Sequence, residues 1–189
     1  MALRDLLIER QAVLCERWLD AILAQYGALT AVRWRRERDP FANPVGHTLA
    51  SGLPDLLRAV LGDGEPDERA RAALEAIVRI RSVQDLAPSR AVGFLAPLRD
   101  VIRAELGAEL EGGAHARDLA AIDARIEQLV LLAFDGYVAV REQVFRLRQE
   151  ELKRSVGSLL RRWYGGDLPE AASDDVVRLT PPASRGARR

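Results

Sequence analysis

The sequence predicts an all-α protein, built as a helical bundle that ends in a long helix. Ala, Leu, Arg and Glu favour helix and dominate the 189 residues, and no run of β-branched or aromatic residues alternates with period two. Apolar residues recur instead at intervals of three, four or seven, which is the spacing of one helical face. Because 48% of the residues are hydrophobic, the chain is able to bury a core.

Three helices are expected in the N-terminal half of the chain. Apolar spacing predicts the first over residues 3–26 and the third over residues 68–83. Between them, Asn43 is a good N-cap residue, and Pro44 follows at the first helical position, where its missing N–H carries no penalty. The second helix therefore begins there and ends near Leu61, before a Gly-Asp-Gly-Glu-Pro turn.

Two further helices are expected in the C-terminal half. The first covers residues 89–106 and should kink at Pro97, because a proline inside a helix removes a backbone hydrogen bond. After a loop over residues 107–114, apolar spacings of three and four persist for four heptads and predict a long terminal helix. Either this helix breaks at a glycine, Gly136 or Gly157, or its C-terminal part projects.

We expect one helical domain over residues 1–164 and a disordered tail over residues 165–189, where Gly, Pro and Arg gather. No signal peptide is indicated, and no apolar stretch approaches the roughly 20 residues that span a bilayer. The lone Cys15 excludes an intrachain disulfide, which fits a reducing compartment. The protein is therefore expected to be cytoplasmic.

Charge argues against nucleic acid as a partner. The 28 Lys and Arg residues balance 28 Asp and Glu residues, which excludes a bulk attraction to polyanions. Arginines cluster around Trp34 and around Trp163, but acids lie close to both clusters. We interpret the two tryptophans as anchors of helix ends rather than as platforms for bases.

No catalytic, metal or cofactor site is expected. His47 and His115 are the only histidines, and neither has a second histidine or a cysteine at ligand spacing. Cys15 lies in a predicted helix beside apolar residues and is interpreted as an inert thiol. No glycine-rich phosphate loop is present. An enzymatic function would have to use His47 and the polar residues around Gln84 as its catalytic groups.

Two segments resemble the N-terminal domain family of RsbT co-antagonist proteins of the RsbRD type. They are Phe41-Ala-Asn-Pro-Val-Gly-His-Thr-Leu and Arg79-Ile-Arg-Ser-Val-Gln-Asp-Leu-Ala-Pro-Ser-Arg-Ala-Val-Gly-Phe-Leu. A third, Ala133-Phe-Asp-Gly-Tyr-Val-Ala-Val-Arg-Glu, is similar to the start of that family's last helix, and the resemblance covers about residues 5–155.

The resemblance implies a globin-like, non-haem sensory domain that dimerises and takes part in stress signalling. Related co-antagonists carry a C-terminal STAS domain that binds the partner kinase. The residues after Trp163 are too few for such an α/β domain, so we expect a sensor module without one.

The turn chemistry of these segments suggests a ligand pocket. Turns at Asn43-Pro44 and Pro88-Ser89 would aim polar side chains into the space between two helices. Capping of the helix ends is the alternative role for Gln84 and Asp85. Asp135 is expected to pair with Arg79, Arg81 or Arg90. The candidate pocket residues are Phe41, Asn43, His47, Arg81, Gln84 and Ser89.

The predicted function is that of a non-enzymatic sensory or regulatory domain, which forms a homodimer and signals to an unidentified protein partner. A small apolar ligand and no ligand are both compatible with it. The alternative is an accessory or scaffold subunit of a larger cytoplasmic complex, docking through the arginine-rich C-terminal helix. The candidate dimer or partner residues on the last helix are Ile126, Leu129, Tyr137, Val140, Val144 and Leu147.

Overall fold

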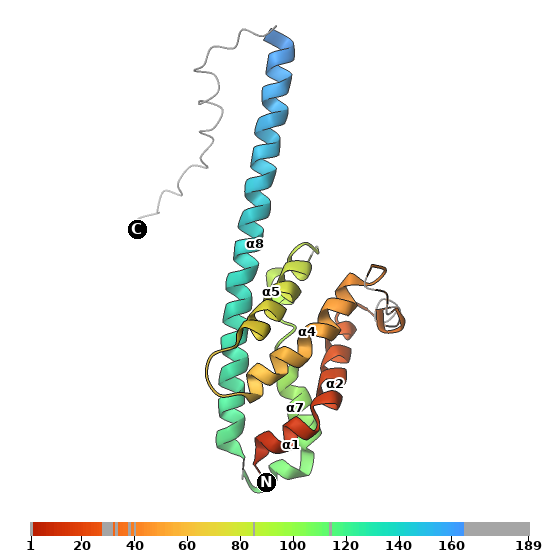
Figure 1. Ribbon diagram of the computed structural model, residues 1–189, viewed down its shortest axis with the longest axis vertical. Helices are drawn as coiled ribbons and strands as arrows, with labels where there is room; N and C mark the ends of the chain where they lie inside the picture. The colour runs from red at the N-terminus through yellow and green to blue at the C-terminus, as the bar shows by residue number, and fades with distance from the viewer. Residues whose placement is uncertain are drawn as a thin grey trace, which may run out of the picture. The chain divides into compact units, whose positions relative to one another are not determined.

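The computed structural model describes residues 2–27, 32, 34–37, 39, 41–84, 86–113 and 115–164. Within these residues every regular element is a helix and none is a strand, which confirms the all-α prediction with its long C-terminal helix (Figure 1). The expected tail over residues 165–189 lies outside the described residues. The elements are α1 (Leu3–Glu9), α2 (Gln11–Ala24), α4 (Pro44–Leu61), α5 (Glu68–Ser82), α6 (Pro88–Val92), α7 (Pro97–Leu106), the 3-10 helix η1 (Gly107–Gly113) and α8 (Ala116–Tyr164).

Two of the expected helices are each divided in the structure. The first divides at Arg10, whose guanidinium donates to the Glu105 carbonyl oxygen and to the Glu109 carboxylate at 2.8 and 2.6 Å. The helix expected over residues 89–106 divides into α6 and α7, because Pro97 begins a new helix instead of kinking an existing one. Residues 107–113, expected as a loop, form the short 3-10 helix.

Helix α8 is continuous through Gly136 and Gly157, so the expected break at a glycine does not occur. The chain nevertheless divides into two units, Met1–Arg141 and Glu142–Arg189. This division falls within α8. The expected boundary between the helical domain and the tail at residue 164 stays a prediction, because residues 165–189 lie outside the described residues.

The core of unit 1 draws side chains from all its helices. Helices α4 and α5 lie side by side (Figure 1), and Gly52 permits their close approach. A Cβ atom at Gly52 would lie 2.9 Å from Cδ1 of Ile77, which is closer than carbon atoms can pack. The largest fully buried apolar side chains are Leu3, Leu7, Leu14, Trp18, Ile22, Leu49, Leu53, Leu56, Leu57, Ile77 and Phe94.

Ion pairs attach the part of α8 within unit 1 to its neighbours. Arg99 pairs with Glu127 at 2.9 Å, and Arg125 pairs with Asp63 at 3.0 Å. The expected pairing of Asp135 was wrong, because this residue lies on the exposed side of α8 and forms no ion pair among the described residues. Arg79 pairs instead with Glu75 on its own helix at 2.6 Å.

Candidate functional site

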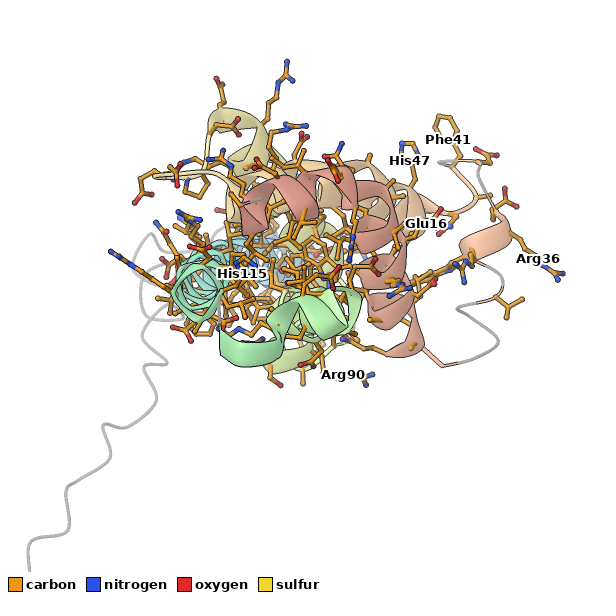
Figure 2. The ribbon with its side chains drawn as sticks, turned by 90° about the horizontal axis from the view of Figure 1, so that it is seen from below. Glu16, Arg36, Phe41, His47, Arg90 and His115 are labelled. Atoms are coloured by element: carbon orange, nitrogen blue, oxygen red, sulfur yellow. The ribbon has the colours of Figure 1, made fainter. Side chains whose placement is uncertain are left out.

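The structure does not gather the six candidate pocket residues around one cavity. Phe41 is 94% exposed, and His47 and Ser89 are also exposed. Figure 2 shows Phe41 and His47 directed outward from the ribbon. Asn43 and Arg81, in contrast, are buried. A pocket built from all six residues is therefore not present.

Two of the six candidate pocket residues, Arg81 and Gln84, belong to one polar cluster, and Arg81 lies at its centre. The residue is 1% exposed, and its guanidinium lies over the rings of Tyr26 and Phe94, at 5.2 and 5.5 Å from their centroids. Its Nε donates to the Ala91 carbonyl oxygen at 2.9 Å and its Nη2 to the Arg90 carbonyl oxygen at 2.6 Å. The guanidinium thus ties the end of α5 to α6.

Tyr26 extends this cluster toward α2. Its hydroxyl accepts a hydrogen bond from Nη1 of Arg81 and donates to Oε1 of Gln84 at 2.9 Å. The Tyr26 ring contacts the Trp34 ring at 4.7 Å between centroids. Sequence reasoning missed Tyr26, because no local motif marks a tyrosine that meets residues more than 50 positions away in the chain.

Burial governs the titration of this cluster. It raises the pKa of the Tyr26 hydroxyl, an effect that the positive charges of Arg81 and Arg90 oppose. Burial also lowers the pKa of the Arg81 guanidinium from its ordinary value. The hydrogen bonds of Arg81 and Tyr26 join α2, α5 and α6, so we describe the cluster as a structural clamp.

Asn43 holds the start of α4. Its Oδ1 accepts from the backbone N–H of Gly46 at 2.9 Å, and its Nδ2 donates to the carbonyl oxygens of Trp34 and Glu37 at 2.7 and 3.1 Å. A Cβ atom on Gly46 would lie 2.2 Å from Nδ2, so this position requires glycine. Asn43 is therefore the N-cap of α4, as the sequence predicts.

Replacing Asn43 should destabilise the protein through this cap. We expect Asn43→Ala to lower the free energy of unfolding by about 2 kcal/mol, because the cap and two hydrogen bonds to backbone carbonyls are lost. Asn43→Asp keeps the accepting oxygen and should lose about half as much. Urea unfolding followed by circular dichroism measures both. Equal losses would contradict the capping role of Oδ1, and no loss for Asn43→Asp would contradict the role assigned to Nδ2.

An open groove of about 570 Å³ lies elsewhere, between α4 and α5. None of the six candidate pocket residues lines it. The expectation of a small apolar ligand therefore stays a prediction. The lining residues are Thr48, Ala72, Glu75, Ala76, Arg79, Ile80 and Val83.

The candidate partner residues of α8 divide between two environments. Ile126, Leu129 and Tyr137 are buried in the core of unit 1, where they contact the same chain and are not available to a second one. Val140 and Val144 are half-buried, and Leu147 is exposed. The periodic stripe read from the sequence is thus mainly the side of α8 that the protein itself covers.

A different side of α8 carries exposed apolar residues. In unit 1 these are Leu131, Phe134 and Val138, which we call the unit 1 stripe. Spacings of three and four place them on one helical face, on the side opposite Ala133 and Tyr137 of the core. In unit 2 the corresponding exposed residues, which we call the unit 2 stripe, are Phe145, Leu152, Val156, Leu159 and Trp163.

The sequence did contain a signal for these stripes. Five apolar residues, each seven positions after the one before, are Leu131, Val138, Phe145, Leu152 and Leu159. A strict seven-residue repeat is typical of helices that pair with other helices. The apolar residues of α8 that face the core are more numerous than this repeat. The sequence alone does not show which of the two sets is buried.

Other chemical features of the chain do not form a site. Burial raises the pKa of the Cys15 thiol to about 11, which keeps it protonated and a poor nucleophile at neutral pH. Among the described residues, no three His, Cys, Asp or Glu side chains are placed to hold a metal ion. In the same part of the chain, no helix combines the length and the hydrophobicity needed to cross a membrane.

Comparison with known proteins identifies the family. The family model described as "RsbT co-antagonist protein rsbRD N-terminal domain" matches residues 12–152, which is most of the chain. No curated protein and no solved structure matches it. The family is one of regulatory domains of stress-response signalling and is not known for enzymatic activity. Since the match includes every helix from α2 to the middle of α8, the chain belongs to the family of RsbRD N-terminal domains.

Proposed function

We propose that this chain is a non-enzymatic regulatory domain that forms a homodimer through the exposed side of α8 and signals to a partner protein. The observation that carries the proposal is the pair of exposed apolar stripes on α8. Membership of a signalling family supports it, because such domains act through contacts with other proteins.

The helix of unit 2 has no core of its own. None of its described side chains between Glu142 and Trp163 is buried, and Leu152 is 65% exposed. Isolated helices of this length are marginally stable in water, and most helical stability in proteins comes from packing of an apolar face. A partner that covers the unit 2 stripe would supply the missing packing.

The energy available from such packing is adequate for dimerisation. Covering one exposed Leu or Phe side chain contributes about 1.5–3 kcal/mol. The stripes supply several such side chains from each of the two copies, and a symmetric dimer covers each of them once. This gain exceeds the cost of immobilising two molecules, which is estimated at about 4–15 kcal/mol.

Two matched variants test which side of α8 makes the dimer. Leu152→Glu places a carboxylate in the unit 2 stripe, and we expect the dissociation constant of the dimer to rise at least about 100-fold, because two charges become buried. Leu147→Glu makes the same change on another side of the same helix and should leave dimerisation within about twofold of wild type. Sedimentation equilibrium over a range of concentrations measures both.

The same measurement decides between this proposal and the alternative function. A wild-type chain that stays monomeric at the highest concentration would contradict the homodimer. It would favour an accessory subunit that docks on a larger complex through its arginine-rich helix. A dimer weakened by Leu147→Glu rather than by Leu152→Glu would move the interface to the other side of α8.

A further inference from the structure

The unit 2 stripe together with one polar residue, Gln149, forms a regular set of core positions for pairing with another helix. With Gln149 included, the residues follow one another at alternating spacings of four and three, which is the spacing of the two core positions of a heptad repeat. Gln149 is exposed, like its apolar neighbours. An apolar stripe this narrow is typical of a helix that packs against one other helix. The six residues, which we call the unit 2 seam, are Phe145, Gln149, Leu152, Val156, Leu159 and Trp163.

Cations lie along both edges of the unit 2 seam. The turn of about 100° per residue in a helix places two of them on each side, and all four are exposed. Among the described acids of unit 2, Glu150 and Glu151 lie further round the helix, and Glu142 lies at the N-terminal end of the seam. The edge cations are Arg148 and Arg162 on one side and Arg146 and Lys153 on the other.

A second copy of this segment brings cations against cations in either orientation. In a parallel pair each edge of one helix meets the other edge of its partner, whereas in an antiparallel pair each edge meets the same edge. Since both edges of the unit 2 seam are cationic, both arrangements join like charges, which is unfavourable. A contact between two unit 2 helices is therefore weakened by its own charges, whatever its orientation.

We propose that the unit 2 seam binds an amphipathic helix of the partner protein, in which Asp or Glu residues flank the apolar heptad positions on both edges. This docking rests on the proposed function, in which α8 signals to a partner, and it adds the chemistry of that partner. Acids at the edges of the partner helix pair with Arg148 and Lys153, so this helix replaces a second copy over the segment. A polar residue of the partner helix meets Gln149, because a buried amide without a hydrogen bond is unfavourable.

An anionic membrane surface is a poorer fit to the same residues. Such a surface also attracts cations, but a helix that lies on it buries a broad apolar face in the lipid. In unit 2 the apolar residues form a narrow stripe, and Gln149 interrupts it. Another helix with its own polar core residue satisfies this pattern.

Two synthetic peptides that differ only at their edges test the chemistry of the partner. Both are amphipathic helices of about three heptads with Leu at the core positions and one Gln among them. All edge residues are Glu in the acidic peptide and Lys in the basic peptide. We expect the full chain to bind the acidic peptide at least about 100-fold more tightly than the basic one. Fluorescence anisotropy of the labelled peptides at about 0.1 M salt measures both dissociation constants.

Two adjacent residues of the chain provide matched variants. Lys153 lies at an edge of the unit 2 seam, and Arg154 lies on the far side of the same helix. We expect Lys153→Glu to weaken binding of the acidic peptide about fivefold. Arg154→Glu makes the same change of charge and should leave binding within about twofold of wild type. Equal losses would overturn docking at the seam, because they would depend on net charge alone.

The outcomes separate this docking from the proposed homodimer. If both peptides bind equally, or if neither binds, the acidic partner helix is overturned, and sedimentation decides the homodimer by itself. A chain that is monomeric in sedimentation and binds the acidic peptide overturns the homodimer and supports the docking. Binding of neither peptide together with binding to vesicles of phosphatidylglycerol assigns the cations to a membrane surface, which also overturns the docking.

Discussion

Trp18→Ala should lower the free energy of unfolding by about 4 kcal/mol, the largest effect we expect from a single substitution. Trp18 is fully buried on α2, a helix that packs against α4 and α7, and its Nε1 donates to the carbonyl oxygen of Phe94 at 2.7 Å. The substitution leaves a large cavity and removes the donor to a buried carbonyl, and both effects destabilise the fold. Urea unfolding monitored by circular dichroism gives the value.

A second substitution at Trp18 separates the loss of the hydrogen bond from the loss of packing, and a substitution at Phe41 is the control. Trp18→Phe keeps most of the packing and should lose about 1–2 kcal/mol, mainly through the hydrogen bond. Phe41→Ala removes an aromatic ring that is 94% exposed and should change the free energy of unfolding by less than about 0.5 kcal/mol. A small loss for Trp18→Ala would mean that the core around Phe94 is not packed as described.

Arg81→Met should lower the free energy of unfolding by about 3 kcal/mol, although methionine fits the same apolar space. The carbonyl oxygens of Arg90 and Ala91 and the Tyr26 hydroxyl would each lose a charged donor. Leaving buried acceptors without a partner is unfavourable even when the new side chain packs well. The same unfolding experiment measures the loss.

Lysine and a neighbouring arginine are the controls for Arg81. Arg81→Lys keeps the charge but cannot reach three acceptors with one ammonium group, so about two thirds of the loss should remain. Arg79→Ala removes an exposed arginine from the same helix, paired only with Glu75, and should change stability by less than about 0.5 kcal/mol. If Arg81→Met and Arg79→Ala have equal effects, the clamp has no energetic role.

The helical content and most helix positions could be predicted from the sequence. Apolar periodicity marks each helix that packs on the core, and the Asn43-Pro44 pair identifies the start of α4 at the right residue. The divisions at Arg10 and before Pro97 could not be predicted in the same way. Arg10 is bound by Glu109 of η1, and that contact exists only after α2 and α7 pack and bring η1 to Arg10.

The candidate site could be predicted only in part. Arg81 and Gln84 do lie together, as the motif suggests, but their common partner Tyr26 is distant in the sequence. The exposed residues Phe41 and His47 share the motif without sharing the cluster. A sequence motif contains residues that are close along the chain. A site contains residues that are close in space, and this depends on which helices pack together.

The two sides of α8 show what the amino-acid sequence determines and what the tertiary structure determines. The sequence by itself determined that a long helix forms and that it carries apolar residues on more than one side, because helical periodicity is a local property. Only the tertiary structure decided that Ile126 and Tyr137 belong to the core and that Leu131 and Leu152 remain exposed. The reason is physical: burial depends on the helices of unit 1 that pack against one side of α8, and no spacing along a single helix records where they lie.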